Sequence, residues 1–330
     1  MLRFFILSAL ISSSLASCQL SETINQPELT EMYPLVLPDD YTDQVGDTLR
    51  IMSWNVEHFV DSYDNPYVDN PRENAPDSSQ LNQRMQLLAD AIRQVNPDVV
   101  VLQEFESEQL ARMIADSLLV DLNYNYFADA ESPDWYMNVI VMSRAPLGLS
   151  IGYGNIYSPL EYEDEAGQTQ KETQRQINTR LFTTEVIPRE DFRFLLSGVH
   201  LKAGRGPRNE AMRMGQLEMM AQQLKRISLG TGIERQLIVG DFNAYPDSEE
   251  INFITGEAGL NFIDPLPAEV DTHPADAPSR RLDYILINEQ MMQYYVDESI
   301  QVRYLYDTAQ QAAASDHLPL VADFVIARDL

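Results

Sequence analysis

Short apolar runs that end in polar or acidic residues recur along the whole chain. In the clearest case, RQLIVGDFNAYPDSEE at 235–250, Leu237 to Val239 lead directly into Gly240, Asp241 and Asn243. Apolar runs of this length predict buried β-strands. Comparable runs predict further strands, at 49–57, 98–104, 137–143, 178–187, 192–199, 281–287, 299–305 and 318–326. The fold must therefore be built around sheets, with polar side chains held at strand ends.

Segments with a helical period lie between several of these strands. One begins near Ser78 or Ser79, which is expected to cap it, and ends before Pro97. A second spans 107–119, and a third follows Asn209. Strands alternate with helices in the first half and outnumber them in the second. This order predicts an α/β (α+β) fold, a large mixed sheet system covered by helices. Because no Gly/Ser-rich linker divides it, residues 48–330 are predicted to form one domain.

The N-terminus has the features of an export signal. Arg3 precedes an apolar stretch that is too short to span a bilayer comfortably, so residues 1–17 are predicted to be a signal peptide. LASC at 15–18 resembles a bacterial lipobox, which makes Cys18 a predicted lipid anchor. Residues 18–47 are polar and predict a tether. The protein is thus expected to be a membrane-anchored lipoprotein facing the periplasm or cell surface. The alternative is ordinary secretion with an incidental cysteine.

The charge balance is strongly acidic, with a formal net charge of −28. Such an excess repels polyanions at long range. A nucleic-acid substrate would therefore need a local basic patch or metal ions. The alternative explanation for the acidic surface is adaptation to a salty medium, where screening shortens the repulsion.

The polar residues at the strand ends share one chemical character. They are Asn55, Glu104, His200, Asp241, Asn243, Asp283, Asp316 and His317. Taken singly, an Asn after a strand is usually a turn former, and a lone His is usually structural. Taken together, acids with Asn and His but no Cys suit a hard cation such as Mg²⁺ or Mn²⁺.

The same positions resemble a known family pattern. In order, the segments SWNVE, VLQE, VHLK, GDFNA, RLDYIL and SDHLPL are similar to the signature segments of the endonuclease/exonuclease/phosphatase superfamily, the deoxyribonuclease-I-like fold. The resemblance covers about residues 49–327. It implies a four-layer sandwich of two mixed, mostly antiparallel β-sheets flanked by helices. It also implies metal-dependent hydrolysis of phosphoester bonds.

The resemblance further implies a metal site. Glu104 would be the principal ligand, with Asn55 and Asp316 close by. The metal would be Mg²⁺ or Mn²⁺, with Ca²⁺ as an alternative.

The resemblance assigns catalytic roles as well. Asp241 would position or deprotonate the attacking water, or bind a second metal, and Asn243 would contact the phosphate or orient the nucleophile. His317 would pair with Asp283 and act as acid/base or phosphate ligand. His200 would contact the phosphate or assist the leaving group.

Basic residues cluster after the first of these histidines. HLKAGRGPRNEAMR at 200–213 includes Lys202 and Arg205, which predict substrate phosphate contacts or else a solvated loop. Arg280 and Arg281 could extend the same rim. Asn138 lies on a family-like strand and is a further substrate-binding candidate.

Three functions fit these observations. The first is an extracytoplasmic nuclease that cleaves DNA or RNA by metal-assisted attack of water. The second is another phosphoesterase, a sphingomyelinase-like phospholipase C or an inositol-polyphosphate phosphatase. The third is an anchored binding protein, which has no need for this full set of acids, Asn and His. A membrane contact is expected through Cys18, and no protein partner is predicted.

Overall fold

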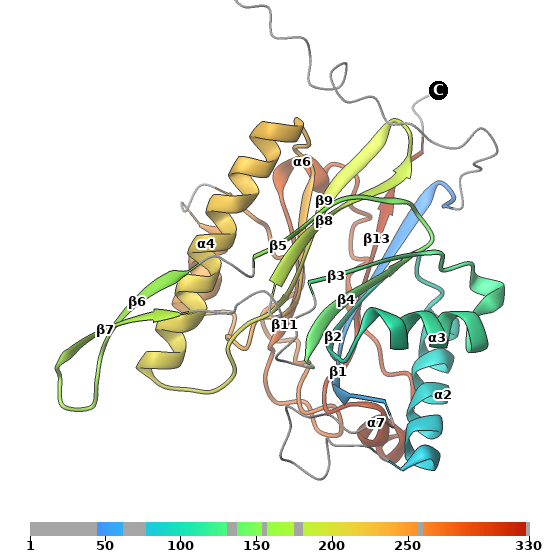
Figure 1. Ribbon diagram of the computed structural model, residues 1–330, viewed down its shortest axis with the longest axis horizontal. Coiled ribbons are helices and arrows are strands. Elements are labelled where there is room, and N and C mark those ends of the chain that lie inside the picture. The colour runs from blue at the N-terminus through green and yellow to red at the C-terminus, as the bar shows by residue number, and fades with distance from the viewer. Residues whose placement is uncertain are drawn as a thin grey trace, which may run out of the picture. The chain divides into compact units, whose positions relative to one another are not determined.

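Two β-sheets packed face to face form the centre of the fold (Figure 1). The computed structural model describes residues 45–61, 77–130, 137–153, 157–174, 181–256 and 260–327. These residues belong to one compact unit, 35–330. The predicted signal peptide 1–17, Cys18 and the tether as far as residue 44 lie outside the described residues.

The first sheet has the strand order β12-β13-β1-β2-β4-β3. Its strands are β1 (Thr48–Phe59), β2 (Val99–Phe105), β3 (Tyr126–Asp129), β4 (Asn138–Ser143), β12 (Gln301–Val302) and β13 (Leu320–Val325). β1 and β2 run parallel, and the other neighbouring pairs are antiparallel.

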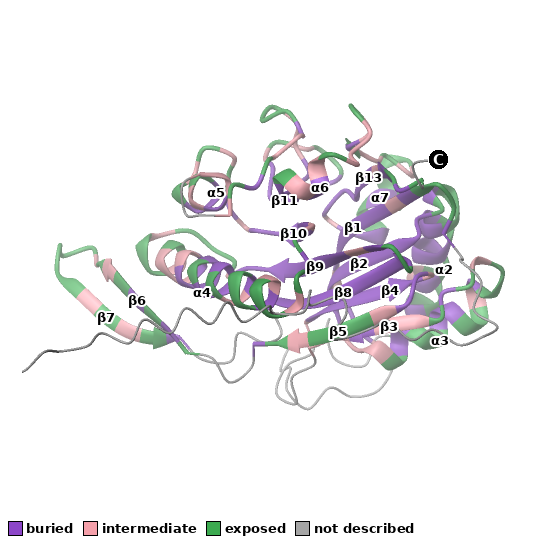
Figure 2. Cartoon of the chain, turned by 90° about the horizontal axis from the view of Figure 1, so that it is seen from above, coloured by how far each residue is buried: buried purple, intermediate pink, exposed green. Residues whose placement is uncertain are grey.

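The second sheet has the order β11-β10-β9-β8-β5. Its strands are β5 (Leu147–Gly152), β8 (Leu181–Arg189), β9 (Phe192–His200), β10 (Gln236–Asp241) and β11 (Asp283–Ile287). β9 and β10 run parallel, and the remaining pairs are antiparallel. A separate hairpin of β6 (Ser158–Glu163) and β7 (Thr169–Gln174) projects beside α4 (Pro207–Thr231) (Figures 1 and 2).

Helices cover the outer face of each sheet. Alongside α4, the helices are α2 (Ser78–Val95), α3 (Glu108–Leu118), α5 (Glu249–Thr255), α6 (Glu289–Met292), α7 (Thr308–Ala314) and the short 3₁₀ helix η1 (Val120–Leu122). α2 and α3 pack on the first sheet, and α4 and α5 pack on the second. No helix in the described ranges is both long and apolar enough to cross a membrane.

The two-residue period of the strands explains this layering. In β1, Leu49 and Ile51 join the core between the sheets, whereas Met52 and Trp54 lie under the helices. All four side chains are buried, and Figure 2 shows strands β2, β4, β8 and β9 mostly buried in the same way. Because successive side chains of a strand point to opposite faces, a run that is apolar at every position must be covered on both sides. The predicted four-layer α/β sandwich of two mostly antiparallel sheets is confirmed.

Three local expectations differ from the structure. The residue that caps α2 is Asp77, whose carboxylate accepts from the Ser79 backbone N–H at 2.6 Å, and not Ser78 or Ser79. The strand expected over 299–305 is reduced to Gln301–Val302. Val45, at the end of the predicted tether, is buried against the core between the sheets.

Candidate active site

Three predicted catalytic residues, Asp241, Asn243 and His317, line a cleft of about 980 Å³. The other two, His200 and Asp283, flank Asp241 in the sheet. Strand register brings three of them into one row, because Asp241 at the end of β10 pairs with His200 of β9 on one side and with Asp283 of β11 on the other. Asp316 and His317 precede β13 and complete the floor from the first sheet. The ends of strands in both sheets therefore build a single site.

A glycine sets the position of this row. Gly240 has φ +136°, and a Cβ there would lie 2.0 Å from the Val199 carbonyl oxygen. Only glycine tolerates this conformation and so close an approach of the two backbones. Asp241, the next residue, is thereby held against β9.

Several non-glycine residues at the site also have positive φ, a conformation that is uncommon outside glycine. Glu104 has φ +56° and Asn243 has φ +51°. Asn243 therefore does not continue β10 in extended form. It folds back, so that its backbone N–H donates to Asp241 Oδ1 at 2.8 Å and its amide donates to Oδ2 at 3.2 Å. The two side chains do converge, but through a turn and not through a strand repeat.

Asn55 links the acids of the two sheets. Its amide nitrogen donates one hydrogen to Glu104 Oε1 at 3.1 Å and the other to Asp241 Oδ2 at 3.0 Å. Its oxygen accepts from the Glu57 backbone N–H at 3.0 Å. Asn55 is buried and fixes the relative placement of the two carboxylates, and its role as a metal ligand stays a prediction.

Asp283 and His317 form a buried pair. His317 Nδ1 lies 2.8 Å from Asp283 Oδ2, which also accepts from the Thr272 hydroxyl at 2.6 Å. His317 Nε2 lies 3.9 Å from Asp241 Oδ2. The carboxylate thus orients the imidazole and leaves Nε2 directed at the cleft floor.

Burial and neighbouring charges move the pKa values of this group apart. Burial works to lower the pKa of His317, but the carboxylates of Asp283 and Asp241 outweigh it and raise that pKa to about 10. Burial raises the pKa of Asp241 to about 7, although His317 works to lower it. Near neutral pH, His317 is a proton donor and Asp241 is close to its titration point.

His200 lies between the other two acids. Its Nε2 is 3.5 Å from Glu104 Oε1 and 3.9 Å from Asp241 Oδ2. Burial works to raise the pKa of Glu104, but His200, His58 and the hydrogen bond from Asn55 together hold it below its ordinary value. Glu104 is therefore ionised at neutral pH.

The donor atoms of the site fit a divalent cation. Glu104 and Asp316 both line the cleft with carboxylate oxygens, which are the ligands that Mg²⁺ and Mn²⁺ prefer. Among the described residues, two sets of three bring ligand atoms within 4.8 Å of one another: His273 with Asp316 and His317, and Asp241 with Asp283 and His317.

The predicted substrate-binding residues separate in space. Arg205 is exposed on the cleft wall, and its guanidinium donates to the Tyr245 hydroxyl at 3.1 Å. Lys202 is half-buried, with its backbone N–H held by Gln216. Asn138 is fully buried and donates to the Glu106 carbonyl at 2.6 Å. Of the three, Arg205 is the one that lines the cleft.

The wider basic rim is smaller than the sequence indicates. Arg208 pairs with Glu172 of the hairpin, and Arg213 pairs in the interior with Glu250 at 2.7 Å. Arg281 is also buried and pairs with Asp264, which corrects its expected place on the rim. Arg280 does line the cleft.

Sequence reasoning missed two other histidines. His58 donates its backbone N–H to Glu104 Oε2 at 3.0 Å, and His273 Nε2 lies 3.1 Å from Asp316 Oδ2. His58 directly follows the strand expected over 49–57, whereas His273 stands away from the end of any expected strand. Because the chain has only 4 His in all, and every one of them contacts an acid of this site, the histidine count was the signal that could have found them.

Two supporting residues were also missed. Glu57 Oε2 accepts the Asp316 backbone N–H at 3.1 Å. Arg84 of α2 donates to the carbonyls of Val56 at 2.5 Å, Glu57 at 2.6 Å and His58 at 2.9 Å. This guanidinium holds the left-handed backbone of Glu57 and His58 at the end of β1.

Comparison with known proteins agrees with this geometry. A family model described as the endonuclease/exonuclease/phosphatase family matches residues 52–317. A search of curated proteins gives no match.

Solved structures with the same fold include proteins from human, D. rerio and Staphylococcus aureus. The human Nocturnin catalytic domain with bound sulfate is 21% identical, with 85% of this chain and 95% of that chain covered and a TM-score of 0.53. TDP2 from D. rerio, complexed with a single-strand DNA product, is 18% identical, with 84% and 98% covered and a TM-score of 0.55. A beta toxin mutant from Staphylococcus aureus with bound magnesium ions is 17% identical, with 83% and 98% covered and a TM-score of 0.52. These likenesses concern the fold.

Proposed function

The chain belongs to the endonuclease/exonuclease/phosphatase family and is a hydrolase of phosphoester bonds, and we propose that it is a nuclease that cleaves the phosphodiesters of DNA or RNA with Mg²⁺ or Mn²⁺. One observation carries the proposal. Asp283 Oδ2 holds His317 Nδ1 at 2.8 Å, and the other ring nitrogen, Nε2, lies 3.9 Å from Asp241 Oδ2. Further acids line the same cleft.

Asp241 is the residue best placed to receive the proton of the attacking water. It lines the cleft, and its pKa of about 7 lets it accept a proton near neutral pH. Asn55 and Asn243 each donate a hydrogen bond to its carboxylate, which fixes the direction of its remaining lone pairs.

His317 supplies the opposite function. With Nδ1–H donated to Asp283, it presents Nε2–H toward the phosphate, where it can neutralise an oxygen or protonate a leaving group. His200 adds a second imidazole beside Glu104.

Glu104 and Asp316 would hold the divalent cation, because both line the cleft with carboxylate oxygens. A bound cation would offset the charge that accumulates on the phosphate and stabilise the leaving oxygen.

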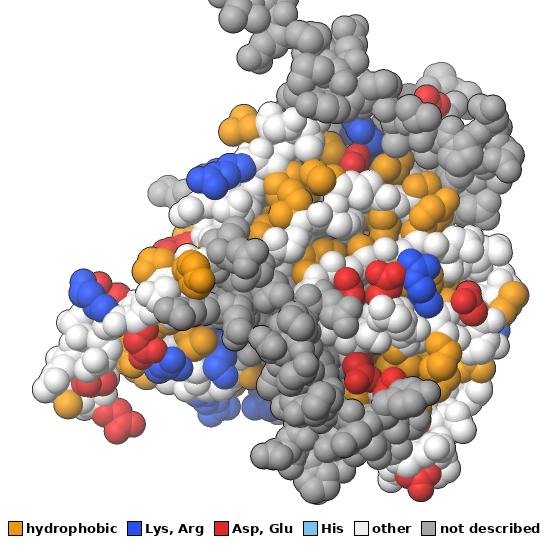
Figure 3. Space-filling view, viewed as in Figure 1, with side chains coloured by type: hydrophobic (Ala, Val, Ile, Leu, Met, Phe, Trp, Pro, Cys, Tyr) orange, Lys and Arg blue, Asp and Glu red, His pale blue; other side chains and the backbone are white. Residues whose placement is uncertain are grey.

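Two basic side chains at the cleft and the surface of the β6–β7 hairpin favour a nucleic acid over a lipid. Arg205 and Arg280 line the cleft beside the acids. The β6–β7 hairpin carries charged side chains of both signs (Figure 3), including Glu161 paired with Lys171, and so lacks the apolar surface that insertion into a membrane requires. That TDP2 was solved with a DNA product is consistent with this choice.

A substrate panel tests the proposal. Purified protein is incubated with single-strand DNA, duplex DNA, RNA, bis-p-nitrophenyl phosphate, sphingomyelin vesicles and inositol polyphosphates, each with Mg²⁺, with Mn²⁺ and with chelator. We expect metal-dependent cleavage of a nucleic acid. Hydrolysis of sphingomyelin or an inositol phosphate alone would reject the nuclease assignment in favour of the other phosphoesterases.

Two variants connect any activity to this site. Asp241→Ala and His317→Ala should each reduce kcat/KM by about 10²–10⁴-fold. Leu229→Ala is the control, because Leu229 is exposed near the C-terminal end of α4 and does not line the cleft. This variant should keep full activity.

We also propose that the protein is exported and anchored through a lipid on Cys18, on the grounds of the signal-like residues 1–17. Labelled palmitate should be incorporated by the full chain and not by Cys18→Ser. Equal labelling of both would reject the anchor.

A further inference from the structure

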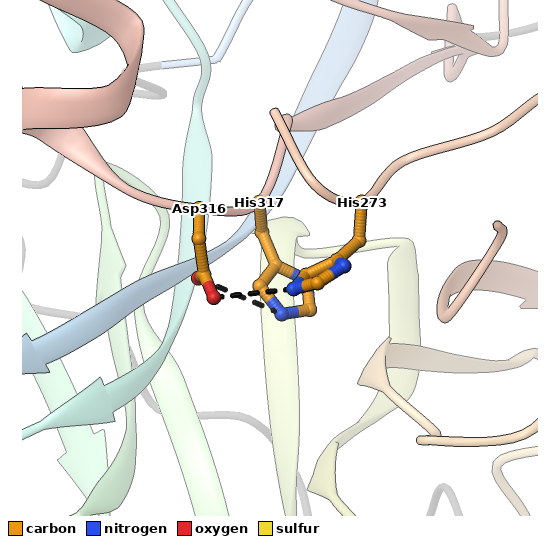
Figure 4. A group of neighbouring side chains, drawn as sticks. All are labelled: His273, Asp316 and His317. Atoms are coloured by element: carbon orange, nitrogen blue, oxygen red, sulfur yellow. Dashed lines mark hydrogen bonds and ion pairs between the residues drawn. The ribbon is translucent and has the colours of Figure 1, made fainter. Parts of the chain in front are cut away.

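We propose that His273, backed by Arg280, is a positioning residue that fixes the carboxylate of Asp316 for divalent cation binding. The inference rests on the proposed function only in taking Asp316 as a metal ligand. Figure 4 shows the carboxylate of Asp316 reaching both imidazoles. Its Oδ2 lies 3.1 Å from His273 Nε2, and its Oδ1 lies 3.8 Å from His317 Nε2.

Arg280 determines which nitrogen of His273 carries the proton. The guanidinium Nε–H donates to His273 Nδ1 at 2.8 Å. The same guanidinium also lies 3.5 Å from His273 Nε2 through its Nη2, a longer contact. Because arginine is always a donor, the shorter bond of 2.8 Å assigns Nδ1 as the acceptor and places the ring proton on Nε2. His273 therefore donates Nε2–H to Asp316 Oδ2.

This tautomer rules out the simplest alternative. The three side chains His273, Asp316 and His317 are close enough to bind a metal together. However, a metal ligand needs a lone pair on the nitrogen that faces the ion, and in His273 that nitrogen holds the proton. His273 acts on Asp316 and not on the metal directly.

The backbone around His273 is built to hold this contact. The Leu318 N–H donates to the Thr272 carbonyl at 2.9 Å, and the Ala275 N–H donates to the Asp316 carbonyl at 2.7 Å. These bonds fasten the loop to the segment that carries Asp316. The neighbouring side chains Thr272 and His273 then each orient one carboxylate, Thr272 acting on Asp283 and His273 acting on Asp316.

Fixing Asp316 matters because its side chain is 43% exposed. Without the hydrogen bond from His273, a carboxylate as exposed as this one would sample several rotamers. Cation binding would then cost the conformational entropy of confining it to one rotamer. With Oδ2 held by His273, the other oxygen lies 3.8 Å from His317 Nε2 at the cleft that Asp316 lines. Partners that orient a ligand in this way typically contribute about 10–100-fold to metal affinity.

The test measures Mn²⁺ binding without substrate, from the electron paramagnetic resonance signal of free Mn²⁺. The variants are His273→Phe, which removes the donor, and His273→Gln, whose Nε2–H can replace it. Tyr124→Phe is the matched control. It removes one buried hydrogen bond, to the Pro97 carbonyl, and Tyr124 does not line the cleft.

We expect Mn²⁺ affinity to fall about 10-fold or more in His273→Phe and to recover in His273→Gln, with no change in Tyr124→Phe. The Mg²⁺ concentration for half-maximal hydrolysis should follow the same order. Wild-type affinity in a folded His273→Phe variant would overturn the proposal, as would a His273→Gln variant no better than His273→Phe.

If His273→Phe does not fold, Arg280→Met decides, because it frees Nδ1 and should weaken Mn²⁺ binding while sparing His273. Wild-type affinity in Arg280→Met would then overturn the proposal.

The nuclease assignment and the positioning role of His273 can fail independently of each other. Wild-type protein that binds Mn²⁺ with the expected order of variants but cleaves no phosphodiester disproves the nuclease, and active protein whose Mn²⁺ affinity ignores His273 disproves the positioning role. Absence of Mn²⁺ binding by wild-type protein also overturns the positioning role.

Discussion

Asp241 and His317 face each other across 3.9 Å and should together set the pH dependence of the reaction. Hydrolysis requires Asp241 ionised, with a pKa of about 7, and His317 protonated, with a pKa of about 10. As pH rises, kcat/KM should therefore increase through about 7 and decrease through about 10. A pH profile of kcat/KM checks this, because it reports the ionisations of the free enzyme.

His317→Gln separates the two limbs of that profile. The alkaline limb should disappear because glutamine does not titrate. The acidic limb should move to higher pH, since the His317 cation works to lower the pKa of Asp241. An alkaline limb that persists near pH 10 would assign it to another group.

Gly240 should be the least replaceable glycine near the site. Gly240→Ala places a Cβ 2.0 Å from a backbone oxygen at φ +136°, and should destabilise the fold by more than about 1 kcal/mol. Gly230→Ala in α4 is the control, because no heavy atom lies within 4 Å of the added Cβ. It should stabilise by about 0.5–1 kcal/mol. Urea unfolding measures both, and equal effects would contradict the strain argument.

Most residues at the ends of apolar runs could be predicted, whereas His273, which a loop carries to the site, could not. Asp241 and Asp283 stand at the ends of apolar strands that pair with each other, so their convergence follows from strand register. Glu104 also follows an apolar run, but it lies in the other sheet and is linked to Asp241 through Asn55. His273 reaches Asp316 through a loop closed by backbone bonds between segments about 40 residues apart, and no local pattern encodes that closure. Arg281 shows the opposite case: its position beside Asp283 predicts a place on the basic rim, but its side chain is buried and pairs with Asp264.

At the scale of elements, the strands that could be predicted from the sequence are those that are buried on both faces. β1, β2 and β10 are central strands with apolar residues on both faces, and their runs were plain. β3 and β5 lie at sheet edges, and most of β5 is exposed or half-exposed. Edge strands need apolar residues on fewer positions, so β3 and β5 left no clear pattern and were not predicted.

Beside the bonds of Gln174 to Met212 and Gln216, one surface ion pair should help to hold the β6–β7 hairpin against α4. Arg208 first, and Tyr162 second, lower the pKa of Glu172 to about 2. The contribution of this pair is therefore present above the ordinary pKa of 4.5 and is lost as pH falls toward 2. Glu172→Gln at neutral pH should speed amide hydrogen exchange in β6 and β7 while leaving Tm nearly unchanged, because exposed pairs contribute little to global stability.

Lys171→Gln is the matched control on the same hairpin. It breaks the pair with Glu161, whose members are 73% and 57% exposed in their side chains. Hydrogen exchange should stay as in the wild type. If both variants speed exchange equally, the loss of any ion pair on the hairpin, and not the contact with α4 in particular, loosens it.

At the scale of the whole molecule, a formal net charge of −28 surrounds a cleft that few basic side chains line. Arg205 and Arg280 lie on its wall, while Arg213 is neutralised by Glu250. A substrate polyanion must therefore approach against long-range repulsion and can gain only a few direct contacts. This balance favours recognition of a short stretch of backbone near the cleaved bond.

The salt dependence of binding measures that stretch. Each phosphate contact to a single strand contributes about −0.7 to the slope of log K against log salt, so two arginines give a slope no steeper than about −1.4. Repulsion by the acidic surface should make it shallower still, because added salt screens it. The measurement uses the Asp241→Asn variant and a labelled oligonucleotide. Adding Arg205→Gln to this variant should make the slope about 0.7 less steep. A slope steeper than about −4 in Asp241→Asn alone would require an extended basic track, which the described residues do not provide.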